Sequence, residues 1–131
     1  MSLFLDASAL VAILAFEPGF EDLVLRADAD SELITSALAQ WEAVRALTKI
    51  WNVEAERAEQ ELADYLATYR VAIVPIGERE ATLALDAHRA YGKGHHPARL
   101  NMGDCFAYAC AKAHGAKLLY KGDDFAQTDL K

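Results

Sequence analysis

Short apolar runs alternate along the chain with longer stretches of helical periodicity. The short runs are rich in Leu, Ile and Val, which is typical of buried strands, and they cover 3–5, 33–35, 71–74 and 117–120. Between them, apolar residues recur every third or fourth position and predict helices over 8–16, 21–27, 37–51, 53–69, 78–91 and 101–114. Strands separated by helices predict right-handed crossovers and an α/β fold, with a mostly parallel sheet covered on both faces.

The helix over 37–51 shows how this periodicity assigns a buried face. Five apolar side chains recur at helical spacing and predict the stripe that faces the core: Leu38, Trp41, Val44, Leu47 and Trp51. Glu42 lies at the edge of this stripe. We therefore expect Glu42 where the helix meets the body of the fold.

The totals predict one folded domain over residues 1–131. A chain of 131 residues with 53% hydrophobic and 25% charged residues is long enough for one substantial core. No apolar stretch approaches the roughly 20 residues of a membrane helix. The apolar start lacks a preceding basic segment and is interrupted by Asp6, so we expect no signal peptide and a cytoplasmic protein without membrane association.

The formal net charge of -7 limits the kinds of function. Affinity for nucleic-acid backbones comes mainly from Lys and Arg, so the charge argues against a passive nucleic-acid coat. It does not exclude a nuclease, because metal ions on clustered carboxylates can reverse the local field. Cys105 and Cys110 lie five positions apart on one predicted helix, match no zinc or redox motif and are predicted to be small core residues.

Two aspartates occupy positions with both a structural and a functional explanation. Asp6 ends the first strand, where open α/β sheets place ligands, yet Asp is also a favoured helix N-cap. Ser8 could cap the same helix or hold Asp6 by a hydrogen bond. Asp104 follows Asn101 by three residues, so the two could form a capping arrangement. The helix after Asp104 is apolar nearly all round, which places this carboxylate at the mouth of a buried helix.

Two further acidic sites have alternatives of the same kind. Glu42 could pair with Arg45 on its own helix, an interaction worth a few tenths of a kcal/mol. Asp123 and Asp124 follow the last strand, and aspartate is common in turns for local hydrogen-bonding reasons. Adjacent side chains point in different directions, so at most one of this pair should reach a shared site.

Together these acids predict a divalent metal site. Carboxylate oxygens select Mg²⁺ or Mn²⁺, and two such ions about 4 Å apart can promote phosphodiester hydrolysis. Competing motifs are absent: the chain has no phosphate-binding loop of the form GxxxxGK[ST] and no Gly-x-Ser-x-Gly elbow. A phosphatase with an aspartate nucleophile would have a second Asp where this chain has Ser8.

The segment 92–99 is the clearest predicted loop and carries several cationic groups. Lys93 and Arg99 could contact phosphates of a substrate. His95 and His96 lack partners at zinc-ligand spacing and are more simply a solvent-exposed polar pair.

These residues resemble a PIN domain, specifically the toxin of a VapBC-type toxin–antitoxin pair. The resemblance covers essentially the whole chain. It is carried by four segments, Phe4-Leu5-Asp6-Ala7-Ser8-Ala9-Leu10, Glu42 in its helix, Leu100-Asn101-Met102-Gly103-Asp104-Cys105-Phe106-Ala107-Tyr108-Ala109, and Leu118-Leu119-Tyr120-Lys121-Gly122-Asp123-Asp124-Phe125. It implies a three-layer α/β/α sandwich, a Mg²⁺- or Mn²⁺-dependent endoribonuclease, a homodimer, and neutralisation by a VapB-type antitoxin in a heterotetramer or larger complex.

The resemblance also implies roles for individual residues. Asp6 and Asp104 would be the main metal ligands, and Glu42 would complete the ligand set or orient a water on the metal. Alignment on Phe125 favours Asp124 as the fourth acid, with Asp123 as a possible substitute. Ser8 and Asn101 would fix Asp6 and Asp104. Little chain follows Asp129-Leu130, so the last strand expected of the family is short or missing.

The expected function is therefore an RNase that cleaves RNA, plausibly tRNA or rRNA, and arrests translation when free of its antitoxin. Helices 8–16 and 37–51 could supply a groove for an amphipathic segment of that antitoxin. The main alternative is a catalytically weak PIN-like scaffold whose acids attract the basic tail of a protein partner. A metal-dependent DNA nuclease or phosphatase would share the ligands and differ in substrate.

Overall fold

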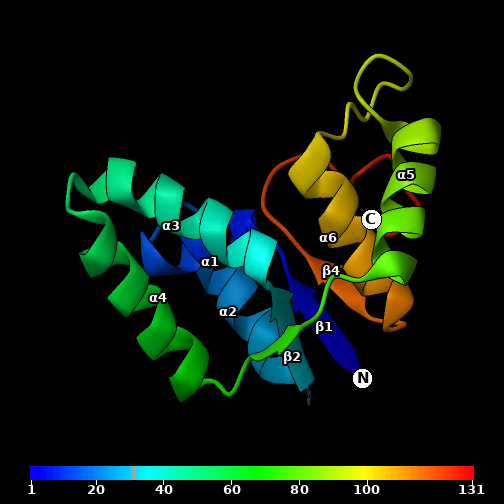
Figure 1. The fold of residues 1–131 in the computed structure, drawn as a ribbon. Helices are drawn as coiled ribbons and strands as arrows, with labels where there is room; N and C mark the ends of the chain where they lie inside the picture. Colours follow the sequence, from blue (N-terminus) through cyan, green and yellow to red (C-terminus); the bar gives the residue numbers. More distant parts are fainter. Residues whose placement is uncertain (31) are drawn as a thin grey trace.

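The computed structural model describes residues 1–30 and 32–131 and shows alternating strands and helices (Figure 1). In chain order the elements are β1 (Ser2–Leu5), α1 (Ala7–Leu14), α2 (Phe20–Ala29), β2 (Glu32–Ser36), α3 (Ala37–Trp51), α4 (Ala55–Thr68), β3 (Ala72–Val74), α5 (Glu78–Tyr91), α6 (Met102–Ala113) and β4 (Lys117–Leu119). The strands form one parallel sheet in the order β3-β2-β1-β4. The predicted α/β fold is confirmed.

Alternating residues of the strands supply two separate cores. Phe4, Ile34 and Leu118 share one register row of the sheet, and all three pack into the core beneath α5 and α6. Leu3, one position earlier on β1, packs instead with the core of α1 to α4, as does Leu119. Because successive side chains of a strand point to opposite faces, the sheet separates two helical layers in a three-layer α/β/α sandwich.

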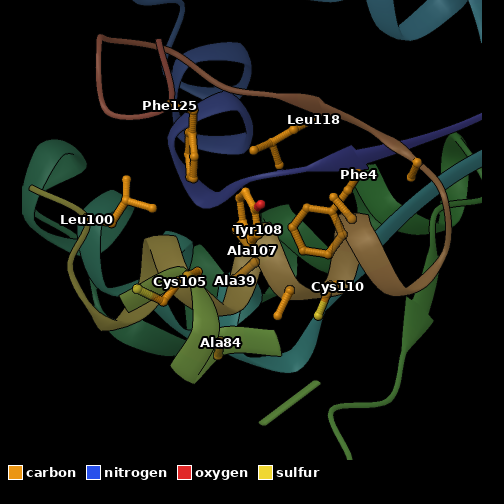
Figure 2. Close-up of a cluster of buried hydrophobic side chains, with 14 of the residues drawn as sticks. Phe4, Ala39, Ala84, Leu100, Cys105, Ala107, Tyr108, Cys110, Leu118 and Phe125 are labelled. Carbon is orange, nitrogen blue, oxygen red and sulfur yellow. The ribbon is translucent and has the colours of Figure 1, made fainter. Parts of the chain in front are cut away.

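The core beneath α5 and α6 uses small residues to bring helix and sheet together (Figure 2). Phe4 of β1 is fully buried in this core, and Phe125, in the segment after β4, packs into the same core. The facing side of α6 presents Ala107 and Cys110, which occupy little volume and allow close packing. Cys105 and Cys110 are free, buried thiols, as predicted.

The predicted buried face of α3 is wrong in one respect. Leu47 is fully buried as expected, but the residues that share its face are Ala39 and Ala43, and Trp41 is 56% exposed. The guanidinium of Arg45 lies over the Trp41 ring at 5.0 Å from its centroid. Hydrophobic spacing predicted that the large side chains of α3 are buried. Instead α3 packs through Ala39 and Ala43, whose small side chains allow close contact with the neighbouring elements.

The segment after β4 is held against α6 rather than forming a further strand. Residues 120–131 adopt turns, and Phe125 within them is 1% exposed. The Tyr108 hydroxyl of α6 donates a hydrogen bond to Asp129 Oδ1 at 2.7 Å, and the Lys112 ammonium pairs with the same carboxylate. These contacts fix the turn at Asp123-Asp124, which lies between β4 and the anchored end of the segment.

The order of the strands produces a topological switch point at the carboxyl ends of β1 and β4. The chain moves from β1 to β2 on one side and later places β4 on the other side of β1, so the direction of strand addition reverses here. Ligands of open α/β sheets bind at such switch points. The backbone N–H of Asp6 donates to Leu119 O at 3.0 Å, which joins the two strand ends directly.

Among the described residues, no helix is both long and apolar enough to cross a membrane.

The packing of α3 predicts unequal effects of two substitutions on one helix. Leu47→Ala should lower the free energy of unfolding by about 2–5 kcal/mol, because it leaves a cavity in a fully buried position. Trp41→Ala should lower it by less than about 1 kcal/mol, since only an exposed stacking contact is lost. Urea denaturation of the two variants checks this. An equal loss of stability in both variants would indicate that Trp41 contributes to the buried face of α3.

Candidate functional site

Asp6 is both the N-cap of α1 and the carboxylate that follows β1 at the switch point. Its backbone is extended, and Asp6 Oδ2 accepts hydrogen bonds from the Ser8 backbone N–H at 3.0 Å and the Ser8 hydroxyl at 2.6 Å. Asp6 is 6% exposed. The capping interpretation is therefore correct for Asp6, and it places the carboxylate at the switch point at the same time.

Ser8 connects this carboxylate to the end of β4. The hydroxyl that donates to Asp6 also accepts a hydrogen bond from the Lys121 backbone N–H at 3.0 Å. Lys121 follows β4 and begins the turn that carries Asp123 and Asp124. Ser8 thus connects Asp6 to the start of the acidic turn through hydrogen bonds.

Asp104 is held by a reciprocal capping box at the start of α6. The Asp104 backbone N–H donates to Asn101 Oδ1 at 2.9 Å, and the Asn101 backbone N–H donates to Asp104 Oδ2 at 3.1 Å. Asp104 is 8% exposed although it lies in the first helical turn. The two hydrogen bonds with Asn101 therefore hold the Asp104 carboxylate at the start of α6.

Electrostatics show that Asp6, Asp104 and Asp124 lie near one another. The pKa of Asp104 is raised to about 7, first by burial, although the hydrogen bond from Asn101 opposes this, and then by the charges of Asp124 and Asp6 and a hydrogen bond shared with Asp124. Burial also raises the pKa of Asp6, against the hydrogen bonds from Ser8, and the charge of Asp124 adds to the increase. The carboxylates of Asp6 and Asp104 are buried, and the exposed Asp124 adds its negative charge beside them.

Glu42 reaches the same region from α3. Burial raises the pKa of Glu42, and the negative charge of Asp6 raises it further. The side chain lies against the first turn of α6, where a Cβ placed on Gly103 would be 2.6 Å from the carboxyl carbon of Glu42. In the described residues Arg45 stacks on Trp41 and forms no ion pair with Glu42. The local pairing considered for Glu42 is therefore not found.

Two surface hollows adjoin the acidic turn. One of about 390 Å³ is lined by Asp104, Asp123, Asp124, Lys93 and Arg99, together with Asn101, Gln127 and the loop residues 97–98. The other, of about 490 Å³, is lined by Glu42, Ser8, Lys121 and Gly122. Both Asp123 and Asp124 are exposed and line the first hollow, but it is Asp124 whose charge acts on Asp6 and Asp104. The structure thus brings Lys93 and Arg99 to the hollow that holds Asp104.

The histidines of the loop after α5 make ring and backbone contacts. His88 and His95 contact each other edge to face, with ring centroids 4.9 Å apart. His96 packs on Tyr91, and its Nδ1 accepts a hydrogen bond from the Ala98 backbone N–H at 3.0 Å. These contacts shape the loop that presents Lys93 and Arg99.

The acidic residues fit a hard divalent cation held partly by water. None of the ion pairs in the described part of the chain includes Asp6, Glu42, Asp104 or Asp124, so these charges lack a protein cation. Over residues 1–30 and 32–131, no three His, Cys, Asp or Glu side chains form a metal-ligand group by themselves. Mg²⁺ is usually bound by one or two carboxylates plus waters and substrate phosphate, and an all-oxygen donor set suits it.

Sequence reasoning missed two residues of this region. Gln127 lines the hollow with Asp104 and carried no recognisable signal. Gly103 contacts Glu42 and did carry one, because glycine is unfavourable inside a helix by roughly 1 kcal/mol relative to alanine. A glycine directly before Asp104 in an otherwise alanine-rich helix marks a place where another group approaches closely.

Comparison with known proteins places this chain in a defined family. The PIN domain family matches residues 3–131. A VapC ribonuclease of Rhizobium meliloti strain 1021 is 47% identical over 139 residues, covering 97% of this chain and 98% of that protein. Ribonuclease VapC of Mycolicibacterium smegmatis is 42% identical over 126 residues, covering 96% of this chain and 95% of the relative.

A solved structure agrees with the fold. The crystal structure of Mycobacterium tuberculosis VapC20, described as a sarcin–ricin loop cleaving toxin, superposes with a TM-score of 0.74 at 16% identity. The match covers 98% of this chain and 96% of that one. The chain is a PIN-domain protein, and within that class it belongs to the VapC ribonuclease family.

The burial of Asp104, together with the nearby charges of Asp124 and Asp6, predicts how stability depends on pH without metal. Because the folded-state pKa of about 7 lies above the ordinary 3.8, the folded state retains a proton between these values. The free energy of unfolding should therefore fall as pH rises from about 4 to about 7. Asp104→Asn removes this effect and should stabilise the metal-free protein by about 1–3 kcal/mol above pH 7, with no gain near pH 4.

Thermal unfolding in a chelating buffer at several pH values measures this difference. Asp86→Asn is the matched control, because Asp86 forms an exposed pair with Arg89 and should change stability by less than about 0.5 kcal/mol. A destabilised Asp104→Asn variant at pH 7.5 would contradict the proposed repulsion.

Proposed function

We propose that this protein is a metal-dependent endoribonuclease, the toxin of a type II toxin–antitoxin pair that arrests translation in the cytoplasm. The observation that carries the proposal is the gathering of Asp6, Asp104 and Asp124 at the β1/β4 switch point, where burial and mutual repulsion raise the pKa values of Asp6 and Asp104. A structural role would be served by fewer charges. Kinship with proteins named VapC ribonucleases supports the choice of RNA cleavage.

Each residue would have a distinct role at the proposed metal site. Asp6 and Asp104 would hold Mg²⁺ or Mn²⁺, oriented by Ser8 and Asn101 through the hydrogen bonds described above. Asp124 and Glu42 would complete the ligand set or accept a proton from the attacking water, since both act electrostatically on the same site. The ion would supply a lowered water pKa and neutralise charge on the phosphate.

Structured RNA, such as tRNA or rRNA, is the proposed substrate. Lys93 and Arg99 line the same hollow as Asp104 and Asp124, and both are exposed. Their cationic groups would hold the phosphate backbone on either side of the scissile bond, which locally offsets the net charge of -7. This arrangement explains how an acidic protein binds a polyanion.

A second groove supports an antitoxin partner. It has a volume of about 720 Å³ and lies between α1 and α2 on one side and the end of α3 and α4 on the other, lined by apolar residues that include Phe16, Phe20, Val24, Tyr65 and Tyr69. Phe16 is 73% exposed and Tyr69 49% exposed. An amphipathic helix of a VapB-type antitoxin would cover this groove. Helix α1 contributes as expected, but α4 supplies more of the wall than α3 does.

A homodimer, with a heterotetramer or larger complex on antitoxin binding, completes the proposal. Leu85 and Met102 are exposed around an apolar hollow of about 610 Å³ between α5 and α6. Exposed apolar surface of this kind is typical of an interface between copies.

Substitution of the central carboxylates tests the function. Asp6→Asn and Asp104→Asn should each lower Mn²⁺-dependent cleavage of RNA by at least about 100-fold, because each removes a charge on which the ion depends. Cleavage is measured on total tRNA and rRNA with Mg²⁺ or Mn²⁺, and circular dichroism confirms folding. Asp86→Asn serves as the control and should retain activity.

Two further measurements distinguish the alternatives. Cleavage of DNA of matching sequence at a rate equal to that of RNA would indicate a DNA nuclease. Absence of Mn²⁺ binding in calorimetry, together with full activity in both Asn variants, would overturn the metal-dependent mechanism and favour a protein-binding scaffold.

The antitoxin groove predicts a separation of inhibition from catalysis. Phe16→Glu should weaken binding of the cognate antitoxin by at least about tenfold, since a charge replaces an exposed aromatic anchor, and should leave RNA cleavage unchanged. Leu25→Glu is the matched control, because Leu25 is 69% exposed on α2 and lies outside the residues that line the groove. Equal inhibition of the Phe16→Glu and Leu25→Glu variants by the antitoxin would indicate that the antitoxin binds another surface.

A further inference from the structure

Gly103 is the point where α6 approaches Glu42 of α3. A Cβ placed on Gly103 would lie 2.6 Å from both the carboxyl carbon and Oε1 of Glu42 and would clash with Oε2 as well. Carbon atoms in contact need about 3.5 Å, so no side chain fits while Glu42 keeps its place. The carboxylate therefore rests directly on the backbone of the first turn of α6.

The backbone gives no other reason for glycine at this position. Gly19, Gly94, Gly115 and Gly122 have positive φ values, which side chains rarely adopt, but Gly103 is helical. It is also buried in a helix that is otherwise rich in alanine. Alanine favours a helix more than glycine does, so the space for Glu42 is the feature that glycine provides.

We propose that Gly103 is a positioning residue that allows the Glu42 carboxylate to reach the metal site beside Asp104. Gly103 precedes Asp104 in the chain, and the charge of Asp6 also acts on Glu42. The glycine thereby allows Glu42 of α3 to lie close to Asp6, which follows β1, and to Asp104 in the first turn of α6. This inference rests on the proposed metal-dependent function, and it concerns how the site is assembled.

Gly103→Ala tests the role without threatening the fold. The obstructed group is the far end of a flexible side chain, so Glu42 can move aside while both helices keep their places. In a crystal structure of the metal-free variant, the Glu42 carboxylate should be displaced by about 1 Å or more, with Asp6 and Asp104 unmoved. In calorimetry, Mn²⁺ affinity should fall roughly 10–100-fold.

A double-mutant cycle shows whether the effect acts through Glu42. In a Glu42→Ala background, Gly103→Ala should change Mn²⁺ affinity by less than about twofold, because the group it displaces is gone. Gly77→Ala is the matched control, since a Cβ at Gly77 would meet Glu80 at an ordinary 3.5 Å, and its Mn²⁺ affinity should equal that of the wild type.

The outcomes separate this proposal from the proposed function. An unmoved Glu42 carboxylate in Gly103→Ala, or an equal loss of Mn²⁺ affinity with and without Glu42, would overturn the positioning role even if Asp104→Asn abolishes cleavage. If Asp104→Asn cleaves RNA normally, the proposed metal-dependent function is wrong. The crystal structure of the metal-free Gly103→Ala variant then still shows whether glycine makes room for Glu42.

Discussion

Mutual repulsion among buried carboxylates is the constraint on which the rest of this site depends. Asp6 and Asp104 are nearly excluded from solvent, and each raises the energy of the other when charged. A fold tolerates such a cluster only if other interactions hold each carboxylate in place. Here Ser8 forms hydrogen bonds with Asp6 and with the backbone of Lys121 after β4, and Asn101 forms hydrogen bonds with Asp104. Only the bond between Ser8 and Lys121 joins residues far apart in the sequence.

The carboxylates that cap two helices are also the ones proposed to hold the metal. Asp6 begins α1 and Asp104 belongs to the capping box of α6, so the local explanation of each residue is correct. Both helices also start at the carboxyl edge of the sheet, beside the switch point between β1 and β4. A carboxylate that caps a helix there is automatically directed toward its counterpart. The structural and functional explanations, which looked like alternatives in the sequence, are therefore complementary.

Local signals predicted the fold well, and close approaches were the part that they could not predict. Periodicity located every helix and strand to within about two residues, and Asn101 followed by Asp104 predicted the cap of α6. The buried face of α3 was mispredicted because large apolar residues outweighed Ala39 and Ala43, which pack only where helices come close. The same limitation hid the contact between Gly103 and Glu42, since it depends on the distance between two helices. Likewise, Asp123 and Asp124 differ only in how the anchored turn directs them.

Separation of surfaces would let one small domain combine the proposed catalytic and antitoxin-binding roles. The hollow with Asp104 and Asp124 opens beside α6 and the loop with Lys93 and Arg99, whereas the groove lies between α1, α2 and α4 in the other helical layer. The two regions share no lining residue, yet α1 connects them, because Asp6 is its N-cap and Leu14, its last residue, lines the groove. In the proposed complex, a partner that covers the groove would pack against the helix that Asp6 caps. Inhibition would then not rely on blocking the acidic site alone, since a shift of α1 would move the Asp6 carboxylate relative to Asp104.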